Sequence, residues 1–169
     1  MIGKSPDATR QLASRARAQL EQERPRFQSS AERQRELAGR FFDAVEAGDL
    51  SGLEALLADD VVLRGDGGGK APALARPLQG RSRAAKALRN WGRAMGRFPG
   101  IRIERVEFNG QPGGIIRLGD GRVVSAMAVE TDGERVTRIQ SVVNPDKLGH
   151  LGETIDDYGQ LLKQAGEGG

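Results

Sequence analysis

The chain has 169 residues, with 26 lysines and arginines against 23 acidic residues, one histidine and no cysteine. This length suits one domain with some length to spare. The absence of cysteine excludes disulfides, thiolate nucleophiles and cysteine-ligated metals, and no apolar run is long enough for a signal or membrane helix, so the composition favours the cytoplasm and indicates no membrane role. With His150 as the one histidine, neither a metal site nor a Ser-His-Asp arrangement is expected, and no cofactor is predicted.

The first segment predicts a helix from Ser5 to Glu23, with Ser5 as N-cap and Pro6 at the first helical position. Pro25 is expected to end this helix. A narrow apolar stripe of leucine and alanine runs along it. The rest of its surface is basic and amide-bearing, without an obvious packing partner nearby in the sequence, and it carries Arg10, Gln11, Ser14, Arg15 and Arg17.

Two further helices are predicted next. One begins near Ser29, where Glu32 completes a capping box, and stops at Gly48. Asp49 then caps a third, short helix that is rich in leucine.

The segment that follows predicts a short strand, an irregular stretch and a fourth helix. The strand covers residues 61–63 and breaks into the loop Asp66-Gly67-Gly68-Gly69-Lys70. Residues 71–80 contain two prolines and are expected to be irregular. The fourth helix is expected over residues 82–97, with an apolar face.

The remainder alternates between strand patterns and turn residues. Strands are expected at residues 101–108, 114–118, 122–130 and 135–143. The turns between them are Asn109-Gly110, Gly119-Asp120-Gly121 and Asp132-Gly133. Helices followed by an antiparallel meander predict an α+β fold, in which a strongly curved antiparallel sheet wraps around helices as a cone. Residues 153–169 predict a frayed helix and a disordered tip.

Charge is distributed in blocks. Residues 43–60 carry six acids and no base, whereas the bases between residues 64 and 105 face only Asp66 and Glu104. Such a block suggests an acidic partner, which is nucleic acid, another protein or the acidic segment of the same chain. A solvated helix face is the structural alternative.

The stretch Asn144-Pro145-Asp146-Lys147-Leu148 directly follows the last predicted strand. Proline holds Asn144 extended, and the order Asn-Pro-Asp suits N-cap, N1 and N2 of a short helix. A structural terminus is one interpretation, and a contact surface is the other. The loop from Asp66 to Lys70 is the second such motif, since three glycines let it approach another surface closely, although on its own it is equally a flexible loop.

These motifs, together with the Phe41-Phe42-Asp43-Ala44-Val45 and Gly48-Asp49-Leu50 stretches, resemble the SnoaL-like extension at the carboxyl end of certain extracytoplasmic-function sigma factors. The resemblance covers residues 31–151. It implies a SnoaL-like cone, a fold also described as nuclear-transport-factor-two-like or cystatin-like, with an extra N-terminal helix. It also implies three parts: a remnant of sigma region four at residues 1–26, the SnoaL-like domain at 27–152 and a tail at 153–169.

The resemblance implies a regulator of transcription initiation that acts through contacts with sigma regions two and four and with the RNA polymerase core. Two stretches would supply the contact residues, namely Asp66, Gly67, Gly68, Gly69 and Lys70 in the loop and Asn144, Pro145, Asp146, Lys147 and Leu148 after the last strand. Asp66, Lys70, Asp146 and Lys147 are the candidates for ion pairs. Exposed pairs contribute only about 0 to 1 kcal/mol each, which suits a contact that must release.

The first helix resembles the recognition helix that ends sigma region four. Its DNA-contacting residues would be Ser5, Arg10, Gln11, Ser14, Arg15 and Arg17, because arginine suits phosphates and guanine edges and glutamine suits adenine. Sigma region two and the supporting helices of region four have no counterpart in this sequence. Promoter DNA is therefore an expected partner only in a longer, full-length context.

SnoaL-like cones also occur as cyclases and isomerases, so a small-molecule-binding or enzymatic role is the alternative. A general base needs a fixed position and a tuned pKa. Asp59, Asp60 and Asp66 are the carboxylates to consider, with His150 and Tyr158 as partners, but Asp66 looks too mobile and the others suit structural roles, so no catalytic residue is predicted. A ligand pocket would be lined by Trp91, Met95, Phe98, Phe108 and Met127, although aromatic and methionine residues at helical or strand spacing more often belong to the core.

Overall fold

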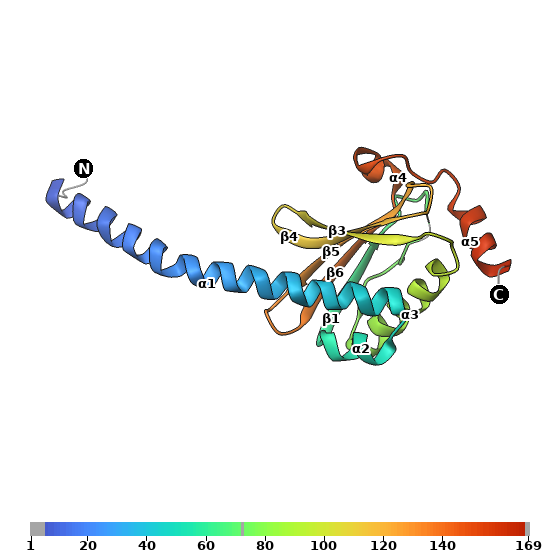
Figure 1. Ribbon diagram of the computed structural model, residues 1–169, viewed down its shortest axis with the longest axis horizontal. Coiled ribbons are helices and arrows are strands. Elements are labelled where there is room, and N and C mark those ends of the chain that lie inside the picture. Colours follow the sequence, from blue (N-terminus) through green and yellow to red (C-terminus); the bar gives the residue numbers. More distant parts are fainter. Residues whose placement is uncertain (1–5, 72, 168–169) are drawn as a thin grey trace.

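The computed structural model describes residues 6–71 and 73–167, without the side chains of residues 6–9, 17, 19–29, 165 and 167. The chain forms a curved six-stranded sheet with helices on its concave face, and one long helix, α1 (Pro6–Ala47), extends far beyond the sheet (Figure 1). The expectation that Pro25 ends one helix and that Ser29 begins another is wrong, because α1 is continuous over 42 residues. A proline inside a helix removes one hydrogen bond and strains one turn, which a long helix can accommodate. Ser5, the expected N-cap, lies outside the described residues.

The predicted helix end at Gly48 and the predicted Asp49 cap of the next helix are confirmed. Gly48, with a φ of +62°, ends α1, and the Asp49 carboxylate accepts a hydrogen bond from Gly52 N at 3.0 Å to cap α2 (Leu50–Leu56). Helix α3 (Arg81–Met95) buries Ala84, Ala85 and Leu88. These small and apolar side chains let α3 pack closely on β1, α1 and α2.

The strands are β1 (Leu57–Asp66), β2 (Leu78–Gln79), β3 (Arg102–Phe108), β4 (Gln111–Arg117), β5 (Val123–Thr131) and β6 (Val136–Val142). Strands β3 to β6 form the predicted antiparallel meander, and the strand order is β2-β1-β6-β5-β4-β3. The sheet as a whole is mixed, since β1, for which the sequence predicted no partner, pairs with β6 in parallel. Strand β2 also lies within the segment that was expected to be irregular.

The carboxyl-terminal elements are α4 (Pro145–Leu148), the 3₁₀ turn η1 (Gly149–Leu151) and α5 (Tyr158–Glu167). Asn144 caps α4 as predicted, because its side chain accepts from Asp146 N. Ile155, Tyr158 and Leu161 are buried in the main core, and the Tyr158 hydroxyl donates to the carbonyl of Val124. The segment after residue 152 therefore contributes to the fold.

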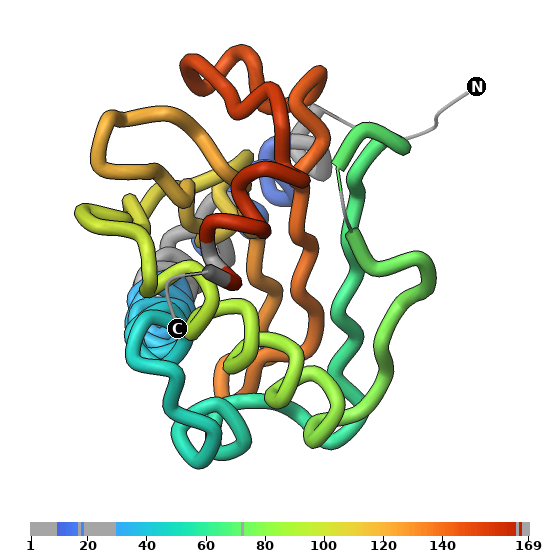
Figure 2. Tube along the Cα trace, turned by 90° about the vertical axis from the view of Figure 1, so that its right-hand side faces the viewer, coloured from blue at the N-terminus to red at the C-terminus, as the bar shows by residue number. Residues whose placement is uncertain are grey.

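Two apolar clusters lie on the two faces of the sheet. The larger one fills the concave side between the strands and α1, α2 and α3, and includes Phe41, Phe42 and Leu53. The smaller one lies on the opposite face, where Leu148 of α4 packs with Ile115, Val123 and Ala126. Figure 2, which views α1 end on, shows the α4 segment and α5 above the level of α3.

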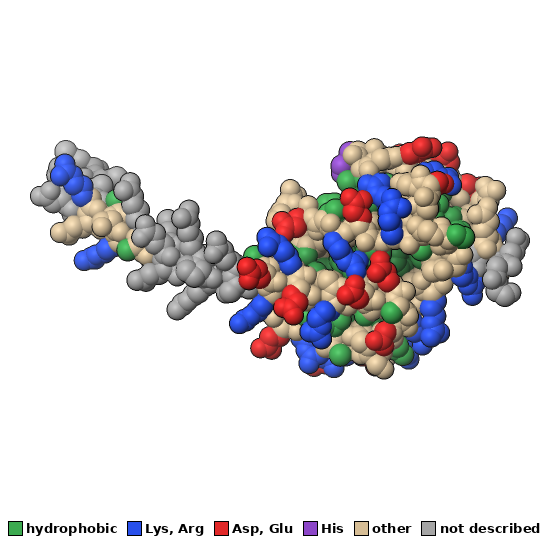
Figure 3. Space-filling view, in the orientation of Figure 1, with side chains coloured by type: hydrophobic (Ala, Val, Ile, Leu, Met, Phe, Trp, Pro, Cys, Tyr) green, Lys and Arg blue, Asp and Glu red, His purple; other side chains and the backbone are tan. Residues whose placement is uncertain are grey.

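Two arginines of the basic block pair with the acidic segment of the same chain, which was one of the predicted alternatives. Arg105 contacts Asp43 at 2.7 Å and Glu46 at 3.5 Å, and its guanidinium lies 4.9 Å from the centre of the Phe42 ring. Arg81 contacts Asp59 at 2.8 Å. Positive and negative side chains accordingly alternate over the domain in Figure 3. Within the described residues, no helix is both long enough and apolar enough to cross a membrane.

Candidate functional site

The parallel pairing of β1 with β6 places the two predicted contact motifs side by side. Asp66 ends β1 and is the register partner of Val142, which ends β6. Val143 N and Asn144 N donate to the Asp66 carbonyl at 2.8 and 3.1 Å. Because parallel strands end at the same edge of a sheet, the loop after β1 and the helix after β6 leave from one place.

Two ion pairs cross between the motifs. Lys70 Nζ lies 2.8 and 3.0 Å from the carboxylate oxygens of Asp146, and Lys147 Nζ lies 2.5 Å from Asp66 Oδ2. The side chains of Lys70, Asp146 and Lys147 remain about three-fifths exposed, whereas that of Asp66 is only 26% exposed. The four charged groups that the sequence singled out thus contact one another and still face solvent.

Gly68 is the point of closest approach between the motifs. A β-carbon at this position would lie 2.3 Å from Asn144 Nδ2 and 2.4 Å from Asn144 Cγ. Asn144 is buried, and its side chain is held as the α4 cap. We call residues 66–70 and 144–148 together the paired-motif surface.

Asp66 is firmly held, so the expectation that it is mobile is wrong. Its Oδ1 accepts from Gly68 N at 3.0 Å, and its Oδ2 accepts from Lys147. The hydrogen bond from Lys147 is the largest influence on Asp66 and lowers its pKa below the usual 3.8. Burial acts in the opposite direction and is the second-largest influence, while the charge of Lys147 and the Gly68 amide add smaller lowering effects. The carboxylate is therefore an anion at neutral pH.

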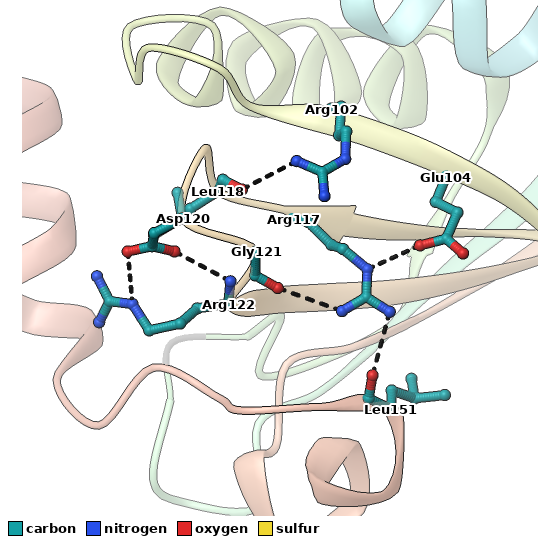
Figure 4. Close-up of polar contacts among 8 residues, drawn as sticks. All are labelled: Arg102, Glu104, Arg117, Leu118, Asp120, Gly121, Arg122 and Leu151. Atoms are coloured by element: carbon teal, nitrogen blue, oxygen red, sulfur yellow. Dashed lines mark hydrogen bonds and ion pairs between the residues drawn. The ribbon is translucent and has the colours of Figure 1, made fainter.

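Arg117 anchors the far end of the α4 segment to the sheet (Figure 4). Its guanidinium contacts Glu104 of β3 at 2.7 Å and donates to the carbonyls of Gly121 and Leu151 at 3.3 and 3.1 Å. Its side chain is only 17% exposed. Leu148 of α4 is buried. The segment from α4 to η1 is therefore fixed at two places, at the paired-motif surface and at Arg117.

The predicted DNA-contacting residues lie elsewhere. Arg10, Gln11, Ser14 and Arg15 are exposed on the part of α1 that projects away from the sheet (Figure 1). Ser5 and the side chain of Arg17 lie outside the described residues. The structure therefore separates the two predicted contact regions, which lie towards opposite ends of the molecule.

A half-open cavity of about 270 Å³ lies between β1, β6 and α3, next to the strand ends that lead into the paired-motif surface. Leu63 and Gly65 of β1 line it, together with Ser141, Val143, Ala73, Leu74, Ala87, Leu88, Trp91 and Met127. Trp91 and Met127 line this cavity, and both also pack in the main core. Phe108 packs on the opposite face of the sheet, and Met95 faces a second hollow on the other side of Trp91.

The remaining candidates for acid or base chemistry lie outside this cavity. Asp59 and Asp60 are exposed within β1, where Asp59 contacts Arg81, and His150 is exposed in η1. Burial raises the pKa of Tyr158 to about 12, and its hydroxyl is engaged with a backbone carbonyl. Within the described residues, no cluster of three or more histidines and carboxylates has the geometry to hold a metal ion.

Sequence reasoning missed the strand-end residues of the cavity and the role of Arg117. Alternation along β1 puts Leu63 and Gly65 on the face opposite Arg64, and alternation was the signal that could have found them. It could not identify the cavity without knowledge that β6 is the neighbour of β1. No sequence pattern marked Arg117, because a single arginine at the end of a strand is not part of a recognisable motif.

Comparisons with known proteins agree with this architecture. Residues 38–143 match the family model for the SnoaL-like domain. The ECF RNA polymerase sigma factor SigJ of Mycobacterium tuberculosis is 27% identical over 155 residues, which cover 88% of this chain and 50% of SigJ. The chain therefore spans about half the length of this relative.

Solved structures support the same relationship. The crystal structure of M. tuberculosis SigJ matches with a TM-score of 0.54 and 30% identity, covering 88% of this chain and 52% of that one. A bacterial protein with a cystatin-like fold from Silicibacter pomeroyi matches with a TM-score of 0.53 and 21% identity, over 79% of this chain and 84% of that one, which shows the fold alone. The resemblance to a sigma-factor extension is thus confirmed, and the chain belongs to the SnoaL-like domain family.

Proposed function

We propose that this chain is the regulatory carboxyl-terminal portion of an extracytoplasmic-function sigma factor, and that it modulates transcription initiation in the cytoplasm. The paired-motif surface is the contact site for sigma regions two and four and for the RNA polymerase core. The exposed residues at the start of α1, with Arg10, Gln11 and Arg15 among them, contact promoter DNA once the rest of the sigma factor supports them.

The observation that carries this proposal is the meeting of the two motifs at one exposed edge. Residues 66–70 and 144–148 are far apart in the chain, yet the crossed ion pairs hold them in one fixed pattern of charges. A contact surface whose charged groups are already positioned loses little side-chain entropy when a partner binds. The similarity to SigJ supplies the kind of partner, because that relative is a sigma factor of about twice this length.

A test measures binding of this chain to sigma regions two and four of the related factor, supplied as separate polypeptides. Changing Asp146→Asn and Lys147→Gln together removes one partner from each crossed pair. We expect this double variant to bind about fivefold more weakly, which corresponds to about 1 kcal/mol, since each charged contact at an interface rim contributes up to about 1 kcal/mol.

The matched control is the double change Asp120→Asn and Arg122→Gln. These two residues form an exposed ion pair of 2.9 Å in the β4–β5 turn, outside the paired-motif surface. The control should bind as the unchanged chain does. Equal binding by all three proteins would remove the paired-motif surface from the contact.

A further inference from the structure

The charged residues of helix α3 are all basic, and the chain has no acidic residue between residues 67 and 103. Arg81, at the start of the helix, contacts Asp59 of β1. The other bases of α3 share its outer side, and they are Arg83, Lys86, Arg89 and Arg93. We call these four residues the α3 basic stripe.

Helical spacing places the α3 basic stripe opposite the apolar face of the helix. At about 100° per residue, its four members fall within an arc of about 120°. Ala84, Leu88 and Met95 lie on the other side of the helix and are buried in the main core. Arg83 and Arg93 are ten positions apart, so the stripe is about 15 Å long.

The stripe keeps its positive charge without a neighbouring acid. Within the side chains that the structure describes, Arg83, Lys86 and Arg93 are exposed and make no hydrogen bond or ion pair. Arg89 donates to Oδ1 of Asn90 at 3.1 and 3.3 Å, and this amide is uncharged. Like charges three or four positions apart destabilise a helix. The stripe therefore retains a repulsion that the ion pairs between α1 and β3 do not have.

The side chains around the stripe decide which acidic partner fits it. Protein interfaces usually have an apolar or aromatic centre, whereas the uncharged residues within this arc are Ser82 and Asn90. A helix that lies on a membrane inserts its apolar face, but that face of α3 is already buried in the core. Phosphates require only positive charge and hydrogen-bond donors, and arginine supplies both. The chemistry therefore favours a nucleic acid.

The dimensions of the stripe agree with a nucleic acid backbone. One strand of B-DNA has a phosphate about every 3.4 Å along the helix axis, so about 15 Å spans about four phosphates. The formal net charge of the chain is only +3, which means that binding depends on where the bases gather. Helix α3 lies at the end of the molecule away from the start of α1 (Figure 1), on the side that faces the viewer in Figure 2.

We propose that the α3 basic stripe binds the phosphate backbone of double-stranded DNA without sequence preference. This contact is separate from the one at the start of α1, and it belongs to the SnoaL-like domain itself. The choice of DNA rests on the proposed function, because a sigma factor acts on promoter DNA. Phosphate contacts position a protein on a duplex but carry no sequence information. The stripe thus adds affinity and orientation, and the reading of bases remains with other residues.

The salt dependence of DNA binding tests the contact directly. Fluorescence anisotropy of a short labelled duplex of arbitrary sequence gives the affinity of the whole chain at several salt concentrations. Each phosphate that a base neutralises contributes about 0.9 to the slope of log affinity against log salt. Changing Arg83→Gln and Lys86→Gln together should reduce this slope by about 1.8 and weaken binding at least about tenfold at 0.1 M salt. Unchanged binding by this variant would overturn the proposal.

Two control variants separate the stripe from overall charge. Arg64→Gln with Arg138→Gln removes the same charge from a hollow on the outer face of the sheet, and this protein should bind as the unchanged chain does. Arg83→Lys with Lys86→Arg keeps both charges of the stripe and should also bind normally. If the first control loses as much affinity as the stripe variant, net charge explains the binding and the proposal fails. Urea unfolding confirms that each variant is folded.

A second background separates the stripe from the start of α1. In a chain that carries Arg10→Gln and Arg15→Gln, the loss caused by changing Arg83 and Lys86 should persist, and its disappearance would refute a contact at α3. Duplex RNA of the same length and poly-glutamate serve as competitors. If either displaces the labelled duplex at a lower concentration than unlabelled DNA does, the choice of DNA is wrong. No sigma region takes part in these measurements, so their failure is distinct from a failure of the proposed function.

Discussion

Replacing Gly68 by alanine tests the contact that joins the two motifs. Gly68 has a φ of +58°, and an added β-carbon would lie 2.3 Å from Asn144 Nδ2. Asn144 is buried and caps α4 through Asp146 N, so it cannot move aside without giving up that cap. The substitution should therefore disturb the residue that begins the second motif as well as the loop that contains it.

The expected loss of stability has two parts. Left-handed backbone costs alanine about 1 to 2 kcal/mol relative to glycine, and loss of an N-cap costs about 1 kcal/mol. Gly68→Ala should therefore lower the free energy of unfolding by about 2 to 3 kcal/mol. Gly69→Ala is the matched control, since Gly69 has a φ of +72° but a β-carbon added there would have no neighbour within 4 Å. It should lose the backbone contribution alone.

Urea unfolding followed by Trp91 emission measures both values. The difference between the two alanine variants, about 1 kcal/mol, is the contribution of the contact with Asn144. Adding Asn144→Ala should shrink that difference, because the smaller side chain leaves room for the new methyl group. If Gly68→Ala and Gly69→Ala lose the same amount, the close approach of the two motifs has no energetic consequence and the reasoning is refuted.

Three further outcomes follow from single contacts. Arg117→Ala should lower the free energy of unfolding by about 2 kcal/mol, because it removes charged hydrogen bonds from a mostly buried guanidinium, whereas Arg122→Ala should cost less than about 1 kcal/mol in the same urea assay. Since folding lowers the pKa of Asp66, its ion pair should stabilise the fold above pH 3.8 and lose that effect as the pH falls below it, so unfolding curves of Asp66→Asn and the unchanged chain should converge in acid. Tyr158, the one tyrosine, should ionise near pH 12 in the folded chain when its ultraviolet absorbance is followed. Because the unfolded chain releases this proton near pH 10, the free energy of unfolding should fall as the pH rises above 10. Ionisation near pH 10 without unfolding would contradict the burial of Tyr158.

The sequence correctly predicted the turns and helix caps that are formed by residues close together in the chain. Asn109 and Gly110 both have positive φ, as their turn requires, and Asp132 accepts from the amides of Glu134 and Arg135 to close the next turn. The Asp49 cap was readable for the same reason. The prediction that a helix ends at Pro25 was wrong because it considered the free-energy cost of one proline without the many helix-favouring residues on both sides.

Long-range pairing was beyond local signals. Alternation in β1 shows which residues face inward, but it does not say that β6 lies beside β1 or that the two strands run parallel. Asp66 and Asp146 were therefore expected to find partners on another protein region, whereas Lys147 and Lys70 of the same chain supply them. The identity of the charged residues was predictable, and their mutual contact was not.

The crossing of the two ion pairs has a consequence for the electric field of this surface. One pair runs from the loop acid to the α4 base, and the other runs from the loop base to the α4 acid, so their dipoles point in opposite directions. The field of two opposed dipoles falls off with distance faster than that of a net charge, and a partner senses it only at contact. Exchanging Lys70 with Asp146 would keep their mutual attraction but turn one dipole round, so that the two dipoles add instead of opposing each other. This exchange separates the internal support of the surface from its recognition by a partner.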